Sequence, residues 1–163
     1  AVEFTAITFQ NPIYPGDTLL VEYGIKGYVT GAITLSIGFN ADYTTTNYQS
    51  GIDDQHARDS TSEGSPTADS ASAVIGQTVA ASRECVGWVE VRLTPSGFLD
   101  ALTQFTVGAD NATASNRLTR KGHVTKTGGA ISPITSMKVF ANAALGLVAG
   151  SWLKVTKSAR GAE

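Results

Sequence analysis

Residues 11–40, NPIYPGDTLLVEYGIKGYVTGAITLSIGFN, carry the pattern that decides the fold. Apolar side chains alternate with polar or small ones in two neighbouring runs, and the turn-forming stretches PGD and GYVTG bound these runs. Because successive side chains of a strand point to opposite faces, this alternation predicts an antiparallel pair of strands with one buried face. The predicted inward positions are Leu19, Val21, Tyr23, Ile25, Ile33, Leu35, Ile37 and Phe39.

The same two-residue period recurs along most of the chain. It predicts eight or nine strands with at most a turn or two of helix, and we expect an all-β fold, an antiparallel β-sandwich. The strand count favours a jelly-roll-like arrangement. Residues 116–126, NRLTRKGHVTK, form a polar strand that we place at a sheet edge, where Lys and Arg discourage further pairing. The other predicted core positions are Val89, Val91, Leu93, Phe105, Val107, Met137, Val139, Leu153 and Val155.

One long polar loop, about residues 41–73, interrupts the pattern. Residues 53–73 contain no Val, Ile, Leu, Met, Phe, Tyr or Trp, so this segment cannot bury enough apolar area to order itself. Loops of this length are uncommon in compact domains and usually serve a function. We predict an irregular arm, residues 53–73, that contacts other copies or the particle, and that can be replaced by a short linker at little cost in stability.

The length of 163 residues is that of one domain, and we assign residues 1–163 to a single β-sandwich. No apolar run approaches the ~18 residues that span a bilayer, so we expect no membrane partner. A single cysteine, Cys85, excludes an intrachain disulfide, and we interpret it as a small buried residue.

Charge is unevenly distributed although the net charge is only −2. Through Asp110 the chain has 13 acidic and four basic residues, and after it eight basic residues and one acidic residue. The basic half could form a surface for nucleic acid, capsid or anionic glycan. We favour the alternative that strands of the two halves pair and their charges meet across one sheet, because the basic residues are not clustered. Nucleic acid is therefore not an expected partner.

No constellation of catalytic residues is visible. His56 and His123 are far apart in sequence and belong to no paired metal-binding motif. The acidic set Asp53, Asp54, Asp59, Glu63 and Asp69 lacks the spacing of a calcium loop and is interpreted as a solvated run. Glu22 and Glu90 point outward in the predicted strands. We therefore expect no enzyme, no metal site and no cofactor.

Aromatic side chains are the remaining candidates for binding. Trp88 and Trp152 alternate away from the aliphatic faces of their strands, and Tyr43 and Tyr48 lie near the base of the polar loop. Exposed planar rings of this kind can stack on sugars, whereas an interface between subunits would bury them. Either glycan stacking or interface burial is open for these four residues.

Three stretches resemble β-sandwich modules of tailed-bacteriophage virion proteins, such as head decorations, head fibres and tail-fibre tips. They are residues 11–38, residues 87–97 (GWVEVRLTPSG) and residues 131–158 (ISPITSMKVFANAALGLVAGSWLKVTKS), the last being the best match. The resemblance covers most of the chain except residues 41–82. It brings no catalytic residues with it.

The resemblance implies a non-enzymatic virion structural protein, made in the bacterial host cytoplasm and carried on the particle. A capsid decoration (cement) or head-fibre component is the leading expectation. Its expected partners are copies of itself, as a homo-oligomer such as a trimer, and the major capsid or another virion protein. The alternative is a receptor- or glycan-binding module of the adsorption apparatus, with a host surface glycan as its partner.

Overall fold

The computed structural model describes residues 4–26, 33–56, 67–70, 74–78, 84–107, 118–141, 147 and 149–158. Over these residues the chain forms eleven strands and one short 3-10 helix, Thr45–Asn47. The strands are β1 (Ile7–Ile13), β2 (Thr18–Lys26), β3 (Ile33–Phe39), β4 (Tyr48–His56), β5 (Thr67–Ser70), β6 (Val74–Thr78), β7 (Glu84–Leu93), β8 (Leu99–Val107), β9 (Leu118–Lys126), β10 (Ile134–Ala141) and β11 (Trp152–Ser158). The predicted all-β class is confirmed, but the described residues form eleven strands and not the eight or nine expected.

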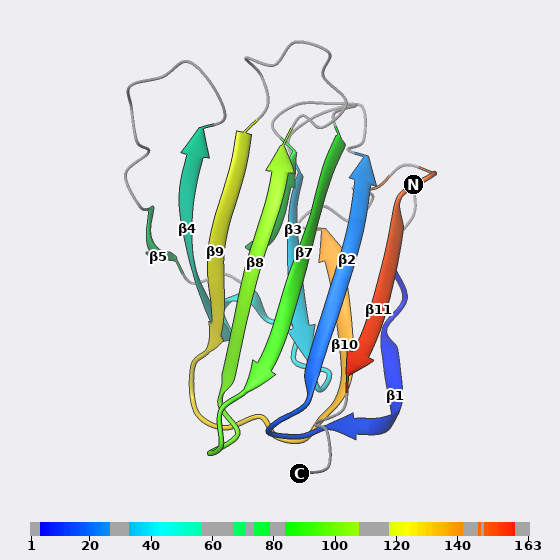
Figure 1. The fold of residues 1–163 in the computed structure, drawn as a ribbon, viewed down its shortest axis with the longest axis vertical. Coiled ribbons are helices and arrows are strands. Elements are labelled where there is room, and N and C mark those ends of the chain that lie inside the picture. Colours follow the sequence, from blue (N-terminus) through cyan, green and yellow to red (C-terminus); the bar gives the residue numbers. More distant parts are fainter. Residues whose placement is uncertain are drawn as a thin grey trace.

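The strands form two antiparallel sheets packed face to face (Figure 1). The four-stranded sheet has the order β1-β10-β3-β6, and the seven-stranded sheet has the order β11-β2-β7-β8-β9-β4-β5. The predicted antiparallel pairing of β2 with β3 is therefore wrong: the two strands lie in different sheets, and their buried faces meet across the core. When β8, β9 and β11 are set aside, the orders become β1-β10-β3-β6 and β2-β7-β4-β5, which is the eight-strand order of a jelly roll. The predicted jelly-roll-like sandwich is therefore confirmed, with the β8–β9 pair inserted between β7 and β4.

The core lies between the sheets and follows the alternation of the sequence. Along β8 the burial alternates residue by residue, with Leu99, Ala101, Thr103, Phe105 and Val107 buried. All predicted core residues are buried except two, which are partly buried and pack against the core. These two, Leu153 and Val155, lie on β11, which within the described residues pairs with β2 alone and forms an edge of the sheet.

The prediction of one continuous polar loop over residues 41–73 is wrong. Residues 48–56 form β4, which pairs with β9 along its whole length, and residues 67–70 form the edge strand β5. Backbone hydrogen bonds to neighbouring strands order this segment, so it needs few apolar side chains of its own. Residues 57–66 and 71–73 of the predicted arm lie outside the described residues. Replacing residues 53–73 would remove four of the nine residues of β4 and all of β5, so we now expect a larger cost in stability.

The strand predicted at a sheet edge is an interior one. β9 pairs with β8 on one side and β4 on the other. Its assignment to an edge depended on taking its partner, β4, as part of a loop. The edges of this sheet within the described chain are β11 and β5.

The two oppositely charged halves of the chain meet across the structure, as the favoured interpretation predicted. Lys154 of β11 lies 2.7 Å from Glu22 of β2, and Lys157 lies 3.2 Å from Asp17. Lys126 at the end of β9 lies 3.0 Å from Asp42. In each pair, a cation from the second half of the chain neutralises a carboxylate from the first half.

A buried polar contact links the two sheets at β6. The pairing of β3 with β6 shifts between Leu35 and Ser36, which leaves Ile75 at an irregularity of the ladder. Two hydroxyls donate to the Ile75 carbonyl: Tyr23 Oη, and Thr103 Oγ1 at 3.1 Å. Burial raises the pKa of Tyr23 well above its usual value, so the phenol stays protonated and acts as donor.

Removing these donors tests whether the contact stabilises the sandwich. We expect Tyr23→Phe and Thr103→Val each to lower the free energy of unfolding by about 1 kcal/mol, because the carbonyl keeps one donor. The double variant leaves the buried Ile75 carbonyl without either hydroxyl donor. Its free energy of unfolding should fall by about 1–3 kcal/mol more than the sum of the two single losses. Urea denaturation of the four proteins measures this coupling. Strict additivity would show that the carbonyl finds another donor.

Candidate functional site

The outer face of the seven-stranded sheet brings two tryptophans together. Trp152 of β11 pairs with Gly24 of β2. Trp88 of β7 pairs with Glu22, which precedes Gly24 by two residues on the same strand. Outward side chains of a strand recur every second residue, so both indoles lie on the same face. Trp152 is 49% exposed, and Trp88 is half-buried.

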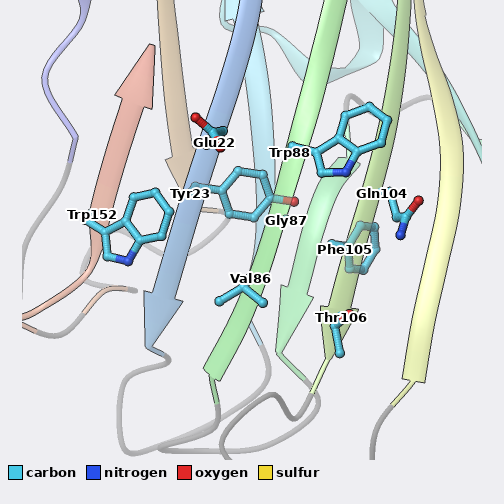
Figure 2. Close-up of a pocket in the computed structure, with 9 residues that line it drawn as sticks. All are labelled: Glu22, Tyr23, Val86, Gly87, Trp88, Gln104, Phe105, Thr106 and Trp152. Atoms are coloured by element: carbon cyan, nitrogen blue, oxygen red, sulfur yellow. The ribbon is translucent and has the colours of Figure 1, made fainter. Parts of the chain in front are cut away.

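An open groove lies between and beside these indoles (Figure 2). Its volume is about 240 Å³, and Val86, Gln104 and Thr106 line it together with Trp88 and Trp152. Figure 2 shows the two indoles on opposite sides of β2, with Glu22 between them and Val86 lower in the view. The groove therefore combines flat apolar surfaces with a carboxylate, an amide and a hydroxyl.

Gly24 allows the Trp152 ring to lie across β2. A Cβ atom at residue 24 would stand 2.4 Å from Nε1 and 2.7 Å from Cε2 of Trp152, far inside van der Waals contact. The indole thus occupies the space that a side chain would take, an arrangement in which an aromatic ring covers a glycine on the next strand. This contact fixes the orientation of the ring that borders the groove.

Glu22 is the charged residue among those that line the groove. Lys154 Nζ donates to its Oε2 at 2.7 Å, and the lysine side chain is 65% exposed. An exposed ion pair of this kind contributes little to stability. Both side chains can therefore replace bound water molecules by the hydroxyl groups of a ligand at a small cost in free energy.

Tyr48 is not part of this groove. Its side chain is fully buried, Phe39 N donates to Tyr48 Oη at 3.0 Å, and Tyr48 Oη donates to the Asp42 carbonyl at 2.9 Å. Burial raises the pKa of Tyr48 to about 12, so the hydroxyl remains a donor. The ring belongs to the core and presents no face for stacking on a sugar.

Tyr43 lies on the opposite side of the sandwich from the tryptophans. Its ring covers Gly38 of β3, where an added Cβ would be 2.8 Å from Tyr43 Cδ1. It meets Phe140 of β10 edge to face at 6.1 Å between centroids, and Lys138 Nζ lies 5.8 Å from its centroid. The sequence prediction thus grouped residues that the fold separates, and only Trp88 and Trp152 share a site.

Asp42 holds the corner between β3 and β4. Its carboxylate accepts hydrogen bonds from Lys126 at 3.0 Å, from Asn47 and from the Thr44 backbone. Burial alone would raise the pKa of Asp42, but these donors outweigh it and hold the pKa below its usual value. The charged group here is engaged in holding the corner.

The histidines lie apart on the ladder of β4 and β9. His123 pairs with Gly51, whereas His56 pairs with Leu118 at the far end of the same two strands. Among the residues that the structure describes, no three His, Cys, Asp or Glu side chains gather in a way that could hold a metal ion.

Several groove residues could not be predicted from the sequence. Val86, Gln104 and Thr106 have no motif, and they join the site only through the register of β7 and β8. Gly24 did carry a signal, because it is a glycine in the middle of a regular strand and such glycines mark close approach of another group.

Comparison with protein-family models, with curated proteins and with solved structures finds no match for this chain. In the described part of the chain, no helix is long and apolar enough to cross a membrane.

Proposed function

We propose that this protein is a non-enzymatic recognition module of a tailed-phage particle that binds a surface glycan on the outer face of its seven-stranded sheet. One observation carries the proposal: two indoles, on the strands that flank β2, share an open groove with Glu22 and Gln104. Binding sites for small ligands combine apolar walls with a few polar groups that set orientation. Sugars match this combination because each ring has a C–H face and a rim of hydroxyls.

The phage setting of the proposal comes from the resemblance of residues 11–38, 87–97 and 131–158 to virion β-sandwich modules. An adsorption module needs a surface that is open to the host cell. Trp152, at 49% exposed, and Val86, at 42% exposed, give the outer face that accessibility in the isolated chain.

A glycan array of bacterial surface polysaccharides and their oligosaccharides tests the proposal. We expect the chain to be retained by a subset of these glycans and to release no shortened product from them. The control variant is Phe98→Ala, which removes an exposed aromatic side chain from the turn between β7 and β8, outside the groove. It should bind the same glycans as the unaltered protein. Failure of the unaltered protein to bind any glycan would reject this function.

A second candidate is a homo-oligomeric capsid decoration (cement) or head-fibre component, such as a trimer attached to the major capsid protein. The observation that favours it lies away from the groove. Tyr14 and Phe98 are 53% and 46% exposed, and they lie on the β1–β2 and β7–β8 turns at one end of the sandwich (Figure 1). Exposed aromatic side chains are enriched at protein interfaces.

Sedimentation of the unaltered protein and of a Tyr14→Ser, Phe98→Ser double variant distinguishes this candidate. A stable oligomer that the two substitutions dissociate, without any glycan binding, would support the decoration role. A monomer at all concentrations, with no attachment to particles, would contradict it.

A further inference from the structure

Two more hollows adjoin the groove on the outer face of the seven-stranded sheet. Each of the three hollows is named here after one of its lining residues. The Gln104 hollow is the groove of Figure 2, with a volume of about 240 Å³. The Lys26 hollow, of about 210 Å³, lies between Lys26, Glu84 and Gly150. The Leu20 hollow, of about 240 Å³, lies between Leu20 and Glu90.

Neighbouring hollows share lining residues. Val86 and Trp152 line both the Lys26 and Gln104 hollows. Glu22 and Trp88 line both the Gln104 and Leu20 hollows. Each boundary therefore contains one indole, and the series follows the outward positions of β2 from Lys26 to Leu20.

The size of the series selects an elongated ligand. Each hollow is smaller than the roughly 300–1,000 Å³ of a pocket for a drug-sized molecule. Six residues of β2 separate the two ends, which corresponds to a length of about 20 Å at the rise of an extended strand. A single sugar ring would fill one hollow and leave the other two empty.

The charges of the series select a neutral ligand. Three carboxylates line the series, and each forms an ion pair with a nearby cation. Lys154 is 2.7 Å from Glu22, and Lys26 is 3.7 Å from Glu84. The third pair is Arg92 with Glu90. A groove that binds nucleic acid or another polyanion carries a surplus of cations along the strand, whereas the described residues that line the three hollows include three carboxylates and one cation, Lys26.

We infer that the outer face binds a neutral linear oligosaccharide that occupies three consecutive subsites along β2. This inference rests on the proposed glycan-binding function and adds the ligand's length and charge. Trp152 and Trp88 separate the subsites and contact the C–H faces of sugar rings beside them. The paired carboxylates and ammonium groups accept from and donate to the sugar hydroxyls.

A length series on the array tests the inference. The probes are neutral glycans of one to six sugar units together with uronic-acid and phosphate-bearing glycans of the same lengths, and a thymidine oligonucleotide. We expect affinity to rise about two- to tenfold for each unit up to three and then to level off. Binding of the trisaccharide should change less than twofold between about 50 and 200 mM salt, because no counterions are released.

Two substitutions at the ends of the series locate the outer subsites. Leu20→Ala and Glu84→Gln should each reduce trisaccharide binding to the level of the disaccharide and leave monosaccharide binding unchanged. Monosaccharides that bind as tightly as trisaccharides, or preference for acidic glycans or the oligonucleotide, would overturn the inference while glycan binding itself could stand. Retention of no glycan at all would instead reject the proposed function and this inference with it.

Discussion

Leu35→Ala is expected to lower the free energy of unfolding by ~2–5 kcal/mol, which is a large part of the stability of a domain of this size. Leu35 is fully buried on β3, and its neighbours across the ladder are Ala141 on β10 and Gly76 on β6. Both neighbours are small, so no large side chain of the same sheet can fill the space left by the leucine. Urea denaturation measures the loss.

The matched control is a leucine-to-alanine change on the outer face. Leu102 on β8 is 48% exposed and lines none of the three hollows. Leu102→Ala should change the free energy of unfolding by no more than about 0.5 kcal/mol. Equal losses at the two positions would contradict the assignment of faces, since a one-residue slip of register exchanges inside and outside.

Removing both indoles should abolish measurable glycan binding. Truncation of a central aromatic contact costs about 2 kcal/mol or more, about thirtyfold in Kd, so Trp88→Ala and Trp152→Ala together should weaken binding by several hundredfold or more. Both side chains lie on the outer face, so the melting temperature should fall only slightly. Isothermal titration with the array-selected trisaccharide measures the effect. Binding within threefold of the unaltered protein would exclude the indoles from the site.

Gly24→Ala separates the orientation of Trp152 from its presence. The added methyl group would overlap the indole at 2.4 Å, so the ring must turn away from β2 while both tryptophans remain. We expect about tenfold weaker binding than in the unaltered protein. An unchanged Kd would indicate that the orientation of Trp152 does not matter.

The sequence predicted the fold where apolar side chains alternate with polar ones. The buried faces of β2, β3 and β7 were predicted correctly, because a buried face demands a large side chain at every second position. The predicted pairing of β2 with β3 is wrong, because the two strands belong to different sheets. β4 was missed because it begins with Tyr48 and continues through Ser50 and Gly51, and its order comes from pairing with β9. Pairing between distant strands involves the backbone, so side-chain pattern carries little information about it.

The candidate site was predicted in part. Trp88 and Trp152 could be singled out as outward aromatics, but Tyr43 and Tyr48 could not be told apart from them. The reason lies in local contacts: Tyr48 meets Asp42 through its hydroxyl, and Tyr43 meets Gly38 through its ring. Whether an aromatic side chain turns inward or outward at a corner depends on such neighbours, which alternation does not specify.

NMR shifts of backbone amides and indole N–H groups show whether a glycan binds on the outer face of the seven-stranded sheet. The array-selected trisaccharide is titrated into the labelled protein. We expect shifts of the Trp88 and Trp152 indole N–H signals and of backbone amides in β2, β7 and β11. Shifts confined to the face of the four-stranded sheet around Tyr43, or to the turns with Tyr14 and Phe98, would exclude binding on this face.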